Sequence, residues 1–141
     1  MKELFQSIHK KYREDTTGLK TTLSGGLFLD HAPQGSTYPY GIYSMISSVT
    51  DEGFDFVIDE ATIQFDFYSN NRSGTSCCNI YNDAKKLYDW CTLSTTGSTQ
   101  FSHISMNREF TRFLSEGEGD DITWRYIAQY GVKWQSSGNK P

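Results

Sequence analysis

The sequence predicts a single α+β domain, in which a twisted antiparallel β-sheet carries two helices packed on one face. Apolar residues recur every three or four positions in residues 1–14 and 75–93, which is typical of amphipathic helices. They alternate with polar residues in 56–68 and 121–134, which is typical of strands with one buried face. Short polar loops separate these segments, so we expect neighbouring strands to pair antiparallel and the helices to cover the apolar face.

The N-terminal half predicts one amphipathic helix and three strands. The helix spans residues 1–14 and ends at a Thr-Thr-Gly sequence, and a further short helical segment follows it. The apolar run 27–29 is a short strand, and with the strand predicted at 40–49 it forms a hairpin-like unit. Asp51-Glu52-Gly53 predicts a turn before the long strand 56–68. The apolar side chains of the helix are Leu4, Phe5, Ile8 and Tyr12, and those of the long strand are Ile63, Phe65 and Phe67.

The C-terminal half predicts the second helix and two closing strands. The helix covers residues 75–93, and the strands cover 101–114 and 121–134. We assign residues 1–135 to the single domain and 136–141 to a flexible C-terminal tail. The helix directs Ile80, Ala84, Leu87 and Cys91 toward the sheet, and the last strand places Ile122, Trp124, Tyr126, Ala128, Tyr130, Val132 and Trp134 on one face.

A proline–glycine loop precedes the strand predicted at 40–49. Its sequence, Ala-Pro-Gln-Gly-Ser-Thr-Tyr-Pro-Tyr, is stiffened and turned by Pro33, Gly35 and Pro39. Pro39 also biases Tyr38 toward extended structure, so that a rigid loop leads into the strand. This loop resembles the Pro-x-Gly-x-x-x-Pro-Tyr loop of the small tail-completion, or tail-terminator, proteins of long-tailed bacteriophages. Pro33, Gly35, Pro39 and Tyr40 occupy the fixed positions of that loop.

The resemblance extends over most of the chain in the order of its elements. The sequence Asp66-Phe67-Tyr68-Ser69 matches the strand end that precedes the helix in that family, and Ala84 and Leu87 match its small and apolar helix positions. The resemblance implies a structural virion protein without enzymatic activity, which caps the tail tube as a ring, usually a hexamer. It also implies that this ring forms part of the interface that joins head to tail, in the neck of the virion.

The partners implied by the resemblance are further copies of the chain, the major tail tube protein and a head-completion or connector protein. DNA passes through the channel of such a ring without sequence-specific binding, and no membrane is involved. A compact domain of this length is ~37 Å across, so a closed ring of six leaves a hole of about the same width, enough for a DNA duplex. A net charge of −4 argues against a protein that coats nucleic acid and suits such a channel.

The sequence has no apolar run that is typical of a signal peptide, and no window approaches the ~20 apolar residues of a membrane span. We therefore expect a protein that is made in the cytoplasm and either stays soluble or is built into an assembly there, and the resemblance implies that this assembly is a virion in the host cytoplasm. Cys77, Cys78 and Cys91 all fall in the predicted helix, where the first and last lie ~21 Å apart along the axis. A disulfide between those two is therefore excluded, and we expect buried thiols in a reducing compartment and no metal site.

We predict no catalytic, cofactor-binding or metal-binding residues. His9 is expected on a charged, solvated helix face, and neither His31 nor His103 has a nucleophile or carboxylate at a suitable spacing. Four carboxylates lie along the third predicted strand and are interpreted as a solvated sheet face. They are Asp55, Asp59, Glu60 and Asp66.

Two other functions are compatible with the sequence. The protein could be another component of the phage neck, a connector or a stopper. It could also be a small-ligand-binding α+β protein, whose pocket would be lined by the aromatic residues of the last strand. We favour the interpretation of these aromatics as a core or subunit interface. They are Trp124, Tyr126, Tyr130 and Trp134.

Two loops are the predicted interface segments. The proline–glycine loop is restricted in conformation and therefore loses little entropy on docking. The acidic turn between the closing strands carries four carboxylates, which cannot be held in an apolar core. We expect both to contact neighbouring subunits or a neighbouring ring. The residues concerned are Pro33, Gln34, Gly35, Pro39 and Tyr40 in the first loop, and Glu116, Glu118, Asp120 and Asp121 in the second.

Overall fold

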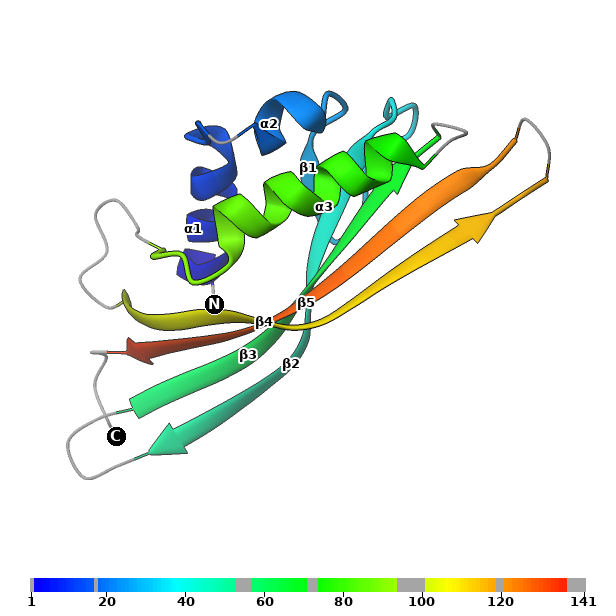
Figure 1. Cartoon of the computed structure of the whole chain (residues 1–141). Helices are drawn as coiled ribbons and strands as arrows, with labels where there is room; N and C mark the ends of the chain where they lie inside the picture. The colour runs from blue at the N-terminus through cyan, green and yellow to red at the C-terminus, as the bar shows by residue number, and fades with distance from the viewer. Residues whose placement is uncertain are drawn as a thin grey trace.

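A computed structural model describes residues 2–16, 18–52, 57–70, 74–93, 101–118 and 121–136. It confirms the predicted α+β class, with a five-stranded sheet and three helices on one side of it (Figure 1). The elements follow in the order α1 (Lys2–Arg13), α2 (Leu19–Thr22), β1 (Leu27–Leu29), β2 (Tyr40–Glu52), β3 (Val57–Ser69), α3 (Thr75–Tyr88), β4 (Phe101–Glu116) and β5 (Thr123–Ser136).

The sheet has the strand order β1-β2-β3-β5-β4 and is mixed rather than wholly antiparallel. The β2–β3, β3–β5 and β5–β4 pairs are antiparallel, as the sequence predicts. The predicted hairpin-like unit is wrong, because β1 pairs parallel to β2, with Leu27 opposite Gly41. The loop between them is long enough to carry the chain back to the end of the sheet where β1 begins. β2 then starts beside the first residue of β1 and runs in the same direction.

The core lies between the sheet and the helices. Phe65 at its centre is fully buried and contacts Tyr88 of α3 and Tyr130 of β5, with ring centroids 4.7 and 5.6 Å apart. The Tyr88 hydroxyl donates a hydrogen bond of 3.0 Å to the carbonyl of Ile8, which ties α3 to α1. The predicted apolar faces are confirmed as buried at Leu4, Ile8, Tyr12, Ile63, Phe65, Phe67, Ile80, Ala84, Leu87, Tyr126, Ala128, Tyr130, Val132 and Trp134.

The second helix ends earlier than predicted, at Tyr88 rather than at residue 93. Trp90 adopts a left-handed backbone with φ of 57°, which an α-helix of L-residues does not continue through. Its N–H instead donates a hydrogen bond of 3.0 Å to the carbonyl of Met106 in β4. The chain therefore leaves the helix axis and attaches to the edge of the sheet.

Cys91 consequently lies beyond the helix, which corrects the prediction that all three cysteines share it. Its sulfur lies 3.5 Å from the sulfur of Met106. The prediction of buried thiols is confirmed for Cys77 and wrong for Cys78, which is exposed, whereas Cys91 is partly buried. Burial raises the pKa of Cys77 and of Cys91 to about 11.

Several predicted boundaries shift or fall outside the described residues. β2 continues through Asp51 and Glu52, where a turn is predicted, and Gly53 lies outside the described residues. Ser136 belongs to β5, so the predicted tail loses its first residue, and 137–141 lie outside the described residues. Within the described part of the chain, no helix is long and apolar enough to span a membrane.

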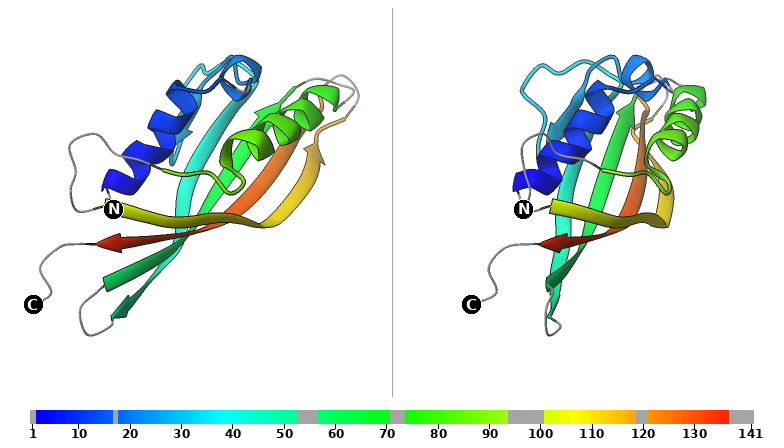
Figure 2. Two further views of the ribbon diagram at one scale, coloured as in Figure 1. Left: turned by 60° about the vertical axis from the view of Figure 1, so that its left-hand side comes forward. Right: turned by 90° about the vertical axis from the view of Figure 1, so that its left-hand side faces the viewer.

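The helices cover only one end of the sheet. The other end, where β2 finishes and β3 begins, extends well past them (Figure 2). Val49 on this extension is 64% exposed. The sheet thus presents to its surroundings an uncovered face, an extended end and two edges.

Candidate interaction surface

The proline–glycine loop has an exposed tip. The Ser36 N–H and hydroxyl both donate hydrogen bonds to the carbonyl of Pro33, at 3.2 and 2.6 Å. Gly35 has a φ of 85°, as the third residue of a type II turn requires. A side chain at Gly35 would meet nothing within 4 Å, and Pro33 and Gln34 are exposed. The turn therefore projects into solvent.

The base of the same loop is held firmly against the preceding chain. The Gly25 N–H donates to the Pro39 carbonyl at 2.8 Å, and the Gly41 N–H donates to the Gly26 carbonyl at 2.9 Å. A Cβ atom at Gly25 would lie only 1.8 Å from the Thr37 carbonyl oxygen, so only glycine permits this approach. An exposed tip on a fixed base is a suitable geometry for docking.

Three tyrosines connect this loop to the uncovered face of the sheet. The ring centroids of Tyr38 and Tyr40 lie 5.3 Å apart, and those of Tyr40 and Tyr68 lie 5.2 Å apart. The guanidinium of Arg125 then lies 5.7 Å from the Tyr68 ring. The contacts form a continuous row from the loop, across β2 and β3, to β5.

Asp66 lies at the centre of the uncovered face, where the sequence predicts a solvated carboxylate. This expectation is wrong, because Asp66 is only 7% exposed. Arg125 donates to its Oδ1 from Nε at 3.0 Å and from a terminal nitrogen at 2.7 Å, and Gln64 donates to it as well. Gln129 donates to Gln64 at 2.9 Å, which extends the polar network along β5. Burial opposes the charge on Arg125, but the hydrogen bonds and attraction from Asp66 raise its pKa overall.

The acidic turn lies at the same end of the sheet as the proline–glycine loop. The register aligns Tyr40 of β2 with Tyr68 of β3, Arg125 of β5 and Leu114 of β4, directly before the turn. Three strand spacings therefore separate β2 from β4 at this end of the sheet, which is ~14 Å. Glu116, Glu118 and Asp121 are exposed, whereas Asp120 lies outside the described residues.

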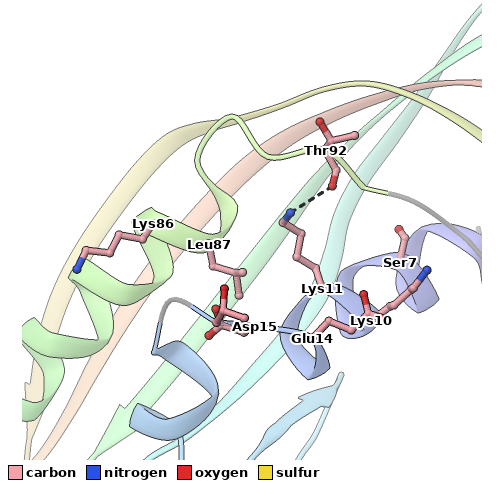
Figure 3. A pocket seen from close by; sticks show the side chains of 9 residues that line it. Ser7, Lys10, Lys11, Glu14, Asp15, Lys86, Leu87 and Thr92 are labelled. Carbon is pink, nitrogen blue, oxygen red and sulfur yellow. Dashed lines mark hydrogen bonds between the residues drawn. The ribbon is translucent and has the colours of Figure 1, made fainter.

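A surface hollow of about 240 Å³ lies between α1, α3 and the segment after α3 (Figure 3). Lys10, Lys11 and Lys86 line it together with Glu14 and Asp15. Lys11 donates a hydrogen bond of 3.4 Å to the Thr92 carbonyl, which spans part of the opening. Charges of both signs line this hollow, and no group of three or more potential metal ligands occurs among the described residues.

The aromatic residues of β5 belong to the core rather than to a ligand pocket. Tyr126, Tyr130 and Trp134 are buried, and Trp124 is partly buried against the same cluster. The Tyr130 hydroxyl donates to Asp89 at 2.6 Å, and burial raises the pKa of Tyr130 far above its ordinary value.

The histidines occupy three different environments. His31 is exposed, whereas His9 is partly buried beside the Tyr12 ring rather than solvated as predicted. Nε2 of His103 lies 3.0 Å from the Cys91 carbonyl, between β4 and the segment after α3. Burial lowers the pKa of both His9 and His103.

Comparison with known proteins supports the fold. Neither a protein-family model nor a curated protein matches the chain. Its fold is similar to that of one chain from the virion of a native gene transfer agent (GTA) particle, with a TM-score of 0.71 and 9% sequence identity. The similarity covers 93% of each chain, so the two share their whole architecture rather than a motif.

The sequence identified both loops but not the surface between them. Tyr68, Gln129 and Arg125 are part of that surface only because the strand register brings them beside Asp66 and Tyr40. One signal in the sequence could have indicated this surface. Asp66 on β3 alternates with the apolar positions, so its carboxylate lies on the opposite face, where a cation on a neighbouring strand could balance its charge.

Proposed function

We propose that this protein is a structural virion component that caps a phage-type tail tube as a homo-oligomeric ring and forms part of the head–tail joining interface. The main support is the architecture shared over 93% of the chain with a chain of a gene transfer agent virion. The match of Pro33, Gly35, Pro39 and Tyr40 to the tail-completion loop supports the more specific assignment to the tail terminus.

The arrangement of the two loops suits a docking end. The loop that carries the exposed proline–glycine turn and the acidic turn lie at one end of the sheet, where the row of tyrosines and the Asp66–Arg125 pair lie between β2 and β5. This end of the sheet presents a proline–glycine turn, acidic side chains and a row of tyrosine rings. Together they can recognise a neighbouring ring, formed either by the tail tube protein or by a head-completion protein. The ring is hexameric in this proposal, and DNA passes through its centre without being bound.

The first test is the position of the protein in particles assembled with it. Labelling with a specific antibody and imaging by electron microscopy should place it at the junction of head and tail. Label on the capsid shell or at the tail tip would contradict the proposal. Label on the head side of the neck would instead favour a connector or stopper.

The second test changes the two loops separately. We expect deletion of residues 34–36, or neutralisation of Glu116, Glu118, Asp120 and Asp121, to leave unattached heads and tails while the protein still folds. The matched control neutralises Glu14, which is exposed directly after α1, and Glu60, which is exposed on β3, and should yield joined particles. Normal particle yield from both loop variants would contradict the assigned docking role.

A further inference from the structure

The exposed apolar side chains are distributed unevenly over the molecule. Among the described residues, every large hydrophobic residue that is exposed lies along one of the two edges of the sheet. None lies on the inner strands β3 and β5, and none lies on a helix. The β1–β2 edge carries Leu29, Tyr38, Met45, Ile46 and Val49, and the β4 edge carries Trp90, Ile104, Phe110 and Phe113.

The β1–β2 edge leaves much of β2 without a neighbouring strand. β1 pairs only with residues 41–43, so from Ser44 onward no described strand lies outside β2. A register shift between Met45 and Ser47 marks the start of this open section. Ile46 and Val49 within it are more than half exposed. Open strand edges and apolar side chains are features of protein–protein contacts.

The β4 edge is marked by Trp90, which is 78% exposed. A tryptophan in the left-handed region costs free energy that glycine or asparagine would avoid. The bond from its N–H to Met106 holds it at the outer edge of β4. Tryptophan is the residue type most enriched among the residues that dominate binding energy at interfaces. An exposed tryptophan held in an unfavourable conformation therefore indicates an anchor.

The stretches of sequence that contain the two edges also differ in charge. Residues 21–71, which contain β1, β2 and β3, include seven carboxylates and no lysine or arginine. Residues 75–116, which contain α3 and β4, include Lys85, Lys86, Arg108 and Arg112 against Asp83, Asp89, Glu109 and Glu116. The stretch of sequence that contains the β1–β2 edge thus has a net charge of −7, and the stretch that contains the β4 edge has a net charge of 0. Such a difference favours contact between unlike edges over contact between two copies of the β1–β2 edge.

We propose that the β4 edge of one copy docks against the β1–β2 edge of the next copy. The partner is a second molecule of this chain, and the contact is heterologous because the two edges lie on opposite sides of the sheet (Figure 1). Heterologous contacts produce closed rings when the rotation closes. The inference rests on the proposed ring and identifies the surfaces that build it, which differ from the loops assigned to docking.

Two variants with one damaged edge each provide the test. The first carries Trp90→Gly and Phe110→Lys on the β4 edge, and the second carries Ile46→Lys and Val49→Lys on the β1–β2 edge. The control carries Asn79→Lys, an exposed position on α3 that faces α2 rather than either edge. All are measured by sedimentation velocity up to millimolar concentration, with circular dichroism to verify folding.

Wild-type protein and the control should associate as concentration rises, and each edge variant alone should stay monomeric. An equimolar mixture of the two variants should form a heterodimer and nothing larger, because each supplies one intact edge. Wild-type protein that remains monomeric, an edge variant that assembles like wild type, or a mixture that remains monomeric would overturn the inference. The two experiments can fail independently. If antibody labels the neck but the edge variants assemble normally, only this inference is refuted. If assembly depends on the edges but antibody labels another part of the particle, only the proposed function is refuted.

Discussion

The inner strands β3 and β5 contrast with the edges of the sheet in what their apolar side chains contact. Phe65 on β3 is fully buried beneath α3, whereas Phe110 on β4 is 47% exposed. Both are phenylalanines in strands of the same sheet, so residue type alone does not explain the difference. Phe65 faces α3, whereas Phe110 lies opposite Gln129 of β5 and faces the uncovered side of the sheet. An edge-strand side chain that lies under the helices, such as Met106 of β4, is buried in the core as well. This teaches that the helices complete the core with the face they cover, and that the apolar side chains left exposed at the edges are available for contact with other molecules.

The strongest test of this contrast exchanges the two phenylalanines for alanine. Phe65→Ala should lower the free energy of unfolding by about 3–5 kcal/mol, because it leaves a cavity among Tyr88 and Tyr130. Phe110→Ala should change it by less than about 0.5 kcal/mol, since the side chain is half in water. Urea denaturation followed by fluorescence measures both. Similar losses for the two variants would show that the edge belongs to the core of the monomer.

The next largest loss of stability is expected from substituting Asp66, at the centre of the uncovered face. Asp66→Asn removes the charge that pairs with Arg125, and should cost about 2–3 kcal/mol because the guanidinium keeps its partly buried position. Glu60→Gln on the same strand is the control and should be nearly neutral, because Glu60 is exposed. Equal effects of the two substitutions would mean that the Asp66 pair contributes as little as a surface ion pair.

The smallest expected effect is a pH dependence of the free energy of unfolding, which arises from His103 of β4. Burial lowers the pKa of His103 in the folded state from 6.5, so the unfolded chain binds protons more readily. Stability should therefore be highest above that pH and should fall as the pH drops through it. His103→Gln should reduce the loss between neutral and mildly acidic pH, whereas His31→Gln, at an exposed position, should retain it. An unchanged pH dependence in the His103 variant would contradict this assignment.

The sequence predicted the elements better than their arrangement, for reasons visible at particular residues. The buried positions of β3, α3 and β5 follow from local periodicity, which depends on the chain alone. The parallel pairing of β1 with β2 arises because the loop between them carries the chain back to the start of β1, which local sequence does not reveal. Burial of Asp66 depends on Arg125, which lies far away in sequence and becomes its neighbour only through the register. The early end of α3 depends on a hydrogen bond from Trp90 to a different strand.

The candidate surface follows the same rule. The proline–glycine loop and the acidic turn were identified because their composition is unusual locally. Their location at one end of the sheet required the register of four strands. The β4 edge was missed because Trp90 falls within the predicted helix, where the sequence offers no sign that its side chain is exposed.

The measurement that tests the contrast most directly is the single substitution Trp90→Gly, assayed for both stability and self-association. Glycine relieves the left-handed backbone, so the free energy of unfolding should stay the same or rise by up to about 1 kcal/mol. Self-association should weaken about tenfold or more, because the side chain anchors the β4 edge. A loss of stability with unchanged association would show that Trp90 serves the monomer, and would contradict the assignment of the edges to contact between copies.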